Sequence, residues 1–217
     1  MKTTIEELIE AIEHDSIVTV KKLCKNGIDL TTPITIGLEY DLEDHDQVSI
    51  LSYAIRNHAS LDLIEVLLAY GCDIHEVDDD GRSSLDIAIK FKREDIILFC
   101  IDKGIDINET HRPSGITPIV LASCFNNTSI VELLLNHGAK INVQDSHGMS
   151  AKDYAKKLGQ KKMLAFLDEK GAKFNRYPQE TEVKSSLTAK VAESQKKMEG
   201  DMTNRQTPTE DMGFDSI

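Results

Sequence analysis

Glycine returns at a near-constant interval along this chain, each time at the end of an apolar run. Gly27, Gly71, Gly104, Gly138 and Gly171 are separated by 44, 33, 34 and 33 residues. A serine or threonine that opens an apolar segment stands 21 or 22 residues before each of the last four glycines. A fixed period of this length is typical of stacked repeats, in which one unit cannot bury its own apolar face. The pattern therefore predicts a row of similar units and favours a binding function over catalysis.

The clearest unit spans residues 115–142. Thr117 is suited to cap a helix through its side chain, and Pro118 fits the first helical position, where a missing N–H costs nothing. Asn126 tolerates the left-handed backbone that ends this helix. An apolar stripe over residues 130–135 predicts a second helix.

This unit resembles the ankyrin repeat. The Thr-Pro-Leu-His-x-Ala opening of that family corresponds to Thr-Pro-Ile-Val-Leu-Ala at residues 117–122. The Ile-Val-x-Leu-Leu-Leu-x-x-Gly-Ala-x-x-Asn closing corresponds to residues 130–142. The resemblance implies an all-α solenoid of helix-turn-helix units joined by hairpin loops. We expect one repeat domain over residues 1–175, with approximate repeats at 1–32, 44–77, 78–110, 111–144 and 145–175.

Two features depart from the family pattern. The histidine of the helix opening is replaced by Ser52, Asp86, Val120 and Asp153. In the family this histidine ties neighbouring turns together, so its loss predicts weaker hydrogen bonding between repeats. The other departure is an insertion at residues 33–43, which predicts an enlarged hairpin loop.

The periodicity ends near residue 176. Residues 176–217 are rich in Ser, Thr, Gln and Glu and poor in large apolar side chains, which predicts a disordered tail. Val183, Leu187 and Val191 are spaced by four, and the alternative that this piece forms a helix on a partner stays open.

The formal net charge of −12 argues against nucleic-acid and membrane partners, because phosphate groups are bound by clustered Lys and Arg. The charge is uneven: residues 1–110 hold 10 basic and 24 acidic side chains, whereas residues 140–173 hold 8 and 4. We interpret the lysines of the last repeat as the solvated outer face of a capping unit. These lysines are Lys152, Lys156, Lys157, Lys161 and Lys162.

The cysteines and the N-terminus both favour a cytoplasmic location. Cys24, Cys72, Cys100 and Cys124 lie far apart without a CxxC pair, so we expect reduced thiols, with Cys124 the most exposed. The first helix carries four glutamates where a signal peptide would be basic and then apolar. No apolar run approaches the ~20 residues that span a bilayer. Export by a route that leaves the N-terminus intact stays an alternative.

No motif of a catalytic or metal site stands out. The chain lacks a GxxxxGK[ST] loop, a GxSxG elbow, a GxGxxG turn and closely spaced His/Cys ligand pairs. The run Asp78-Asp79-Asp80 reads as an acidic hairpin tip, because the rest of an EF-hand loop is absent. We therefore expect no catalytic residue, no metal and no cofactor, with an enzyme or metal-binding protein as a minor alternative.

By resemblance to the family, we expect the concave side to bind another protein. Phe91 and Phe125 occupy positions expected to be exposed, where polar residues would serve equally well if nothing bound there, so they are candidate anchors for a partner. The alternative is that each ring covers the neighbouring helix turn. The full set of candidate partner-binding residues is Asp46, Arg56, Tyr70, Asp79, Asp80, Arg82, Lys90, Phe91, Ile116, Phe125 and Met149.

The acidic hairpin tips favour a basic segment on the partner. On this interpretation we expect the chain to be a monomeric adaptor or inhibitor. An alternative is a bacterial effector delivered into the host cytosol, with residues 210–217 as a C-terminal export signal.

Overall fold

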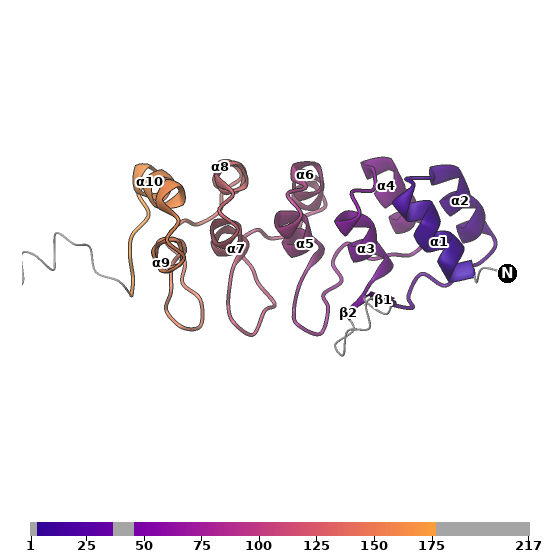
Figure 1. Ribbon diagram of the computed structural model, residues 1–217, viewed down its shortest axis with the longest axis horizontal. Helices are drawn as coiled ribbons and strands as arrows, with labels where there is room; N and C mark the ends of the chain where they lie inside the picture. The colour runs from indigo at the N-terminus through magenta and orange to yellow at the C-terminus, as the bar shows by residue number, and fades with distance from the viewer. Residues whose placement is uncertain (1–3, 37–45, 177–217) are drawn as a thin grey trace, which may run out of the picture. The chain divides into compact units, whose positions relative to one another are not determined.

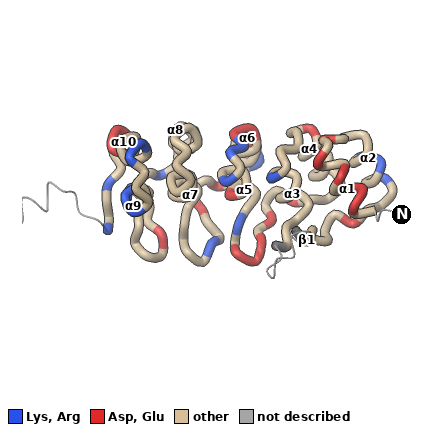
Figure 2. The backbone as a smooth tube through the Cα atoms, in the orientation of Figure 1, with Lys and Arg blue, Asp and Glu red and all other residues tan. Residues whose placement is uncertain are grey.

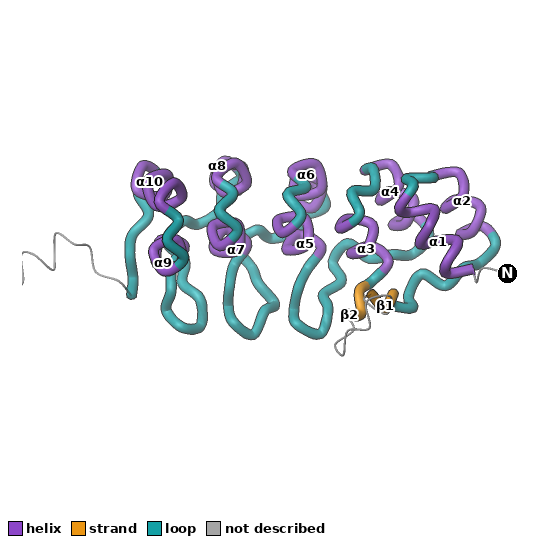
Figure 3. The backbone as a smooth tube through the Cα atoms, in the orientation of Figure 1, coloured by secondary structure: helices purple, strands orange, loops and turns teal. Residues whose placement is uncertain are grey.

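Short helices follow one another in pairs along the computed structural model, which describes residues 4–36 and 46–176. The pairs are α1 (Thr4–Glu13) with α2 (Ile17–Lys25), α3 (Ile50–Arg56) with α4 (Leu61–Ala69), α5 (Ser84–Lys90) with α6 (Glu94–Asp102), α7 (Pro118–Cys124) with α8 (Thr128–Asn136), and α9 (Ala151–Lys157) with α10 (Lys161–Glu169). They stand side by side in Figure 1, with α3, α5, α7 and α9 in one row and their second helices in another. The loops that precede α5, α7 and α9 project from the same side (Figure 3). The predicted all-α repeat solenoid is confirmed for the described residues, and the predicted tail lies outside them.

Two short strands pair at the insertion, one inside its first residues and the other just after it. β1 (Ile34–Ile36) pairs antiparallel with β2 (Asp46–Val48), and Ile34 faces Val48 in this register. Residues 37–45, which hold most of the insertion, lie outside the described residues. Isolated bridges close two later hairpins in the same way, between Val77 and Ser83 and between Gln144 and Ser150.

One apolar core runs through the described residues from Leu8 to Ala172. Consecutive first helices pack against one another from α3 to α9, and each first helix also packs against its own second helix. Each unit therefore buries its apolar face largely against its neighbours. No helix within residues 4–36 and 46–176 combines the length and apolar character that crossing a bilayer requires.

Serine side chains begin three of the five first helices. The hydroxyl oxygens of Ser49, Ser83 and Ser150 each accept a hydrogen bond from the backbone N–H three residues on. Asp86 and Asp153 return the bond by accepting from the backbone N–H of the capping serine. This reciprocal arrangement satisfies two donors that the helix itself leaves unpaired.

These two aspartates stand where the family has histidine, and they also bind segments beyond their own helix pair: Asp86 binds the next unit, and Asp153 binds the chain that follows α10. Asp86 accepts a hydrogen bond from Nε of Arg112 at 3.3 Å, and Asp153 accepts from the backbone N–H groups of Asn175 and Arg176 at 3.0 and 3.2 Å. A carboxylate has acceptor sites enough to cap its own helix and bind the following turn. The expectation of weaker hydrogen bonding between repeats is therefore wrong at Asp86.

Another polar contact between repeats comes from Arg93, which is only 7% exposed. Its guanidinium donates to the backbone carbonyls of Ile55 and Ala59 in the preceding unit, at 3.3 and 2.7 Å. It also forms an ion pair with Asp95 at 2.7 Å, and this hydrogen bond holds the pKa of Asp95 below its usual range. A buried guanidinium requires such partners to offset its loss of hydration.

Thr117 begins α7 as predicted, but its side chain makes no capping hydrogen bond. Its hydroxyl oxygen is buried and has no hydrogen-bond partner among the described residues. The third helical position here is Val120, which offers no polar group where the other units have Ser52, Asp86 or Asp153. The expected side-chain cap is thus wrong, and a buried hydroxyl is left unsatisfied.

We expect Thr117→Val to raise the free energy of unfolding by about 1 kcal/mol, because it removes an unpaired buried hydroxyl at nearly constant volume. Ser83→Ala is the matched control and should lower the free energy of unfolding by about 1 kcal/mol, because the Ser83 side chain does make the capping hydrogen bond. Urea unfolding of both variants checks the pair. A loss of stability in Thr117→Val would show that the hydroxyl is paired in solution.

Two glycines at equivalent hairpin positions have different surroundings. Gly81 and Gly148 both have positive φ, +71° and +72°. A Cβ at Gly81 would lie 2.2 Å from the carbonyl oxygen of His111 in the next hairpin. A Cβ at Gly148 would meet only the side chain of Asn175, at 3.5 Å. The hairpins of the third and fourth units thus approach so closely that only glycine fits.

The two sites separate backbone strain from close packing. Gly148→Ala should lower the free energy of unfolding by about 1 kcal/mol, the cost of the left-handed backbone. Gly81→Ala carries the same cost and a clash with backbone, so we expect a further loss of about 2 kcal/mol. Thermal or urea unfolding measures both, and equal losses would mean that the two hairpins separate easily.

Candidate binding surface

The last residue of α3, α5, α7 and α9, with the residue that follows it in each case, forms what we term the helix-end row. The row comprises Arg56 and Asn57, Lys90 and Phe91, Cys124 and Phe125, and Lys157 and Leu158. These residues occupy the same two positions in four successive units, so the packing of α3, α5, α7 and α9 brings them into line. Phe125 is 40% and Leu158 52% exposed, so two neighbouring units each present a large apolar side chain to solvent in this row.

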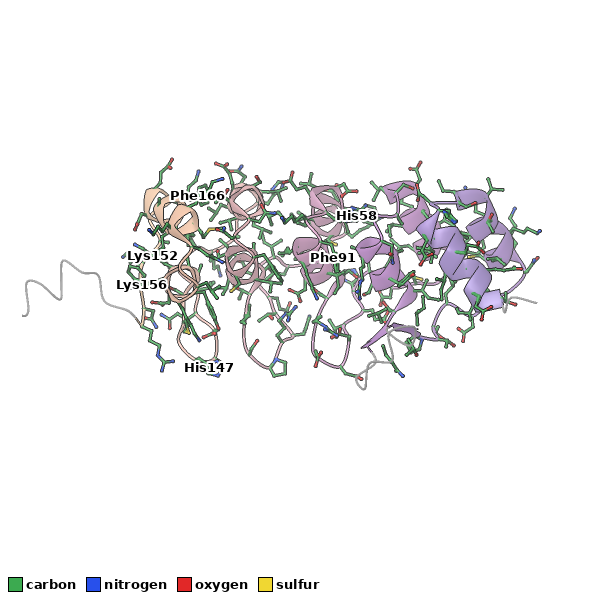
Figure 4. All side chains as sticks on the ribbon, in the orientation of Figure 1. His58, Phe91, His147, Lys152, Lys156 and Phe166 are labelled. Carbon is green, nitrogen blue, oxygen red and sulfur yellow. The ribbon has the colours of Figure 1, made fainter. Side chains whose placement is uncertain are left out.

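Phe91 joins the second and third units. Its half-buried ring has the guanidinium of Arg56 at 5.7 Å and the ammonium of Lys90 at 5.6 Å from its centroid. Cations near an aromatic face are attracted by its quadrupole. Figure 4 labels Phe91 in its place on the ribbon. The half-buried ring therefore lies against a neighbouring helix end, and its role in binding a partner stays a prediction.

A shallow hollow adjoins this ring. Arg56, Lys90 and Phe91 line it, together with Asp78 and Arg82 of the hairpin that precedes α5. Four predicted site residues, Arg56, Arg82, Lys90 and Phe91, thus meet at one place. The sequence analysis placed Arg56 in the second repeat and the other three in the third.

The tip of the third hairpin is less acidic than its sequence indicates. Nε of Arg82 lies 2.5 Å from Asp78, and its guanidinium lies 3.2 Å from Asp80. Asp79 and Asp80 are exposed. The arginine therefore offsets part of the carboxylate charge at this tip.

Other predicted site residues lie elsewhere. Tyr70 is 40% exposed but follows α4, so it belongs to the row of second helices. Ile116 is half-buried and packs against the core. The side chain of Asp46, in β2, lies outside the described residues.

Met149 was expected to be exposed, and this is wrong: it is 5% exposed. The hydrogen bonds of its backbone N–H and carbonyl to Asp145 fix it at the base of the last hairpin, where the thioether is buried.

Lys152 does not lie on a solvated face, contrary to the sequence interpretation. It is 3% exposed, and its ammonium pairs with the carboxylate of Asp168 and donates to the carbonyl of Ala172. The ring of Phe174 lies 4.4 Å from the ammonium. Asp168 comes from α10, and the chain after α10 folds back over α9 and supplies Ala172 and Phe174, so a charge can be buried here. Lys156, labelled with Lys152 in Figure 4, is exposed, as are Lys157, Lys161 and Lys162.

Burial raises the pKa of every cysteine. The pKa of Cys124 rises to about 11, with a smaller contribution from Asp145, and that of Cys72 rises to about 12. Burial also raises the pKa of Cys100 to about 12 and raises that of Cys24. Cys124 is half-buried rather than open. These thiols therefore lack the thiolate character of a nucleophile.

Charge is divided along the stack. Figure 2 shows acidic residues gathered from α1 to α6 with their hairpins, and basic residues over α9 and α10. In the part of the chain that the structure describes, no three His, Cys, Asp or Glu side chains come together as metal ligands would.

The comparisons with known proteins point to one family. The family model for ankyrin repeats matches residues 8–111 and 108–177. E3 ubiquitin-protein ligase hecd-1 of Caenorhabditis elegans is 28% identical over 145 residues, which are 66% of this chain and 5% of that protein. A fowlpox virus protein named for ankyrin repeats is 46% identical over 65 residues, 29% of this chain and 19% of its own length. A Rickettsia felis protein with the same kind of name is 27% identical over 144 residues, 65% of this chain and 45% of its own length. The chain thus spans less than half the length of each of these relatives.

The raised thiol pKa values predict slow alkylation. At pH 8 we expect iodoacetamide to modify Cys72, Cys100 and Cys124 in the folded chain more than about a hundredfold slower than free cysteine. Peptide mass spectrometry over time measures each site, and the same chain in urea is the control. Rapid modification of Cys124 alone would show that its thiol is open to solvent.

Proposed function

Because the chain belongs to the ankyrin repeat family, we propose that it is an adaptor or inhibitor that holds a partner protein against its helix-end row and hairpin tips. Ankyrin repeats form protein–protein interaction modules. In this proposal the chain has no enzymatic activity of its own and works as a monomer in the cytoplasm.

The observation that carries the proposal is the exposed apolar part of the helix-end row. Phe125 and Leu158 are 40% and 52% exposed, and Phe91 is half-buried beside two cations. Aromatic and arginine side chains dominate the binding energy of most protein interfaces. At the hairpin tips, Asp79 and Asp80 would contact basic side chains of the partner and act mainly on the association rate.

A second candidate is a protein delivered from a bacterium into a host cell. The similarity to a protein of Rickettsia felis favours it. Its export signal would be residues 210–217, which lie outside the described residues. Removing this segment separates the two candidates, because an adaptor keeps both its partner and its location whereas an effector keeps the partner and is no longer translocated.

A quantitative pull-down with the full chain as bait tests the proposal. We expect Phe91→Ala combined with Phe125→Ala to lower recovery of the partner at least about tenfold, because truncating two central anchors costs several kcal/mol. Mass spectrometry of the bound proteins measures recovery.

The matched control changes exposed apolar residues of the second helices. Val18→Ala combined with Leu98→Ala removes side chains that are 81% and 39% exposed, away from the helix-end row. Thermal unfolding confirms that both double variants are folded. Equal recovery by all baits contradicts the proposed surface.

A further inference from the structure

The helix-end row has a charge opposite to that of the whole chain. The chain carries a formal charge of −12, yet the ionisable side chains of the row that are charged at neutral pH are Arg56, Lys90 and Lys157. Lys90 and Lys157 are exposed, and the row contains no carboxylate. Each cation stands beside an apolar or amide side chain at the next position.

Three carboxylates of these helices and hairpins are engaged inside the stack, whereas Asp79 and Asp80 are exposed at the third hairpin and Asp78 borders the hollow beside Phe91. Asp86 is 4% exposed and accepts from Ser83 and Arg112. Asp153 is fully buried and binds the residues that follow α10. Asp145 is 7% exposed and accepts from the hydroxyl of Tyr154 at 2.6 Å. These acids therefore serve as internal acceptors and stand apart from the exposed cations of the row.

The ring of Phe91 sets where two of these cations lie. Arg56 and Lys90 stand 5.7 and 5.6 Å from its centroid, so they come from successive units to one apolar centre. A guanidinium held in this way retains donors in a planar fork that suits a carboxylate. Carboxylate recognition thus coincides with an apolar anchor site.

We propose that the helix-end row binds an extended acidic segment of a partner protein, in which Asp or Glu residues alternate with aromatic or aliphatic residues. This inference rests on the proposed function and names the chemistry of the partner. Neighbouring packed helices lie about 8–10 Å apart, and an extended chain advances about 3.3 Å per residue. One anchor therefore recurs about every three residues. The fourth unit has Cys124 in place of a cation, so the segment needs no acid opposite Phe125.

Fluorescein-labelled peptides of about twelve residues test the chemistry directly. The probes are repeats of Asp-Leu-Ser, of Lys-Leu-Ser and of Asp-Ala-Ser, titrated with the full chain by anisotropy. We expect the Asp-Leu-Ser peptide to bind at least about tenfold tighter than either other peptide, because it alone supplies both charge and apolar contacts. Raising the salt from about 0.02 M to about 0.3 M should weaken it. Equal affinities, or no binding by any probe, overturn the proposal.

Charge reversal locates the site. Lys90→Glu combined with Lys157→Glu should lower affinity for Asp-Leu-Ser at least about tenfold. Lys21→Glu combined with Lys140→Glu changes the net charge equally at exposed positions outside the row, and should leave the affinity within about twofold. If both double variants lose affinity for the peptide equally, the loss reflects the net charge of the chain, and the assignment of the binding site to the helix-end row is overturned.

The chain carries an acidic and apolar stretch of its own at residues 210–217. Asp211→Asn combined with Asp215→Asn tests whether it competes for the row. If this variant binds the Asp-Leu-Ser peptide with unchanged affinity, a partner protein is supported as the occupant of the row. If it binds the peptide threefold or more tightly, the assignment of the row to a partner protein is overturned. The pull-down tests the proposed function separately. If a partner requires Phe91 and Phe125 but the chain shows no preference for acidic peptides, the proposed interaction module is supported and only this inference is overturned.

Discussion

No helix of the described residues is long enough to be stable by itself. Each spans seven to ten residues, below the length at which an isolated helix holds in water. The interface between units must therefore supply the missing stability. The core from Leu8 to Ala172 is the apolar part of that interface. The positions of the side chains in the helix-end row depend on this shared packing, because it fixes the spacing and direction of successive first helices.

The polar part of the interface differs from unit to unit. Where the family uses one histidine, Asp86 binds the next unit and Asp153 binds the chain after α10. Arg93 adds two bonds to the carbonyls of the preceding unit. Gln160 makes a similar bond to the carbonyl of Cys124 at 2.8 Å. The fourth unit matches the family's sequence best, yet it leaves the hydroxyl of Thr117 unpaired. Similarity to a family pattern is therefore a poor guide to local stability.

The helices could be predicted from the sequence because their signals are local: a hydroxyl residue, an apolar stripe and a glycine at fixed spacing. Arg56 and Lys90 could be placed at a surface by the same spacing. The burial of Lys152 could not, because its partners Asp168 and Phe174 lie far along the chain and meet it only when the end of the stack folds back. Met149 escaped prediction for a similar reason, since the hairpin geometry set by Asp145 decides its exposure.

Charged side chains have two separate roles in this molecule, one inside the stack and one at its surface. The net charge of the chain therefore does not by itself indicate which ligand the surface binds. Buried carboxylates bind backbone and side-chain donors within the stack, so they contribute to the negative total without repelling an acidic ligand as exposed groups would. Exposed cations at the helix ends lie beside Phe91 and Leu158, where desolvation by a partner would strengthen their interactions. Long-range attraction still follows the summed field, so the chain as a whole attracts basic partners at low salt. Local recognition at the row depends instead on the side chains within a few ångströms, and these favour carboxylates.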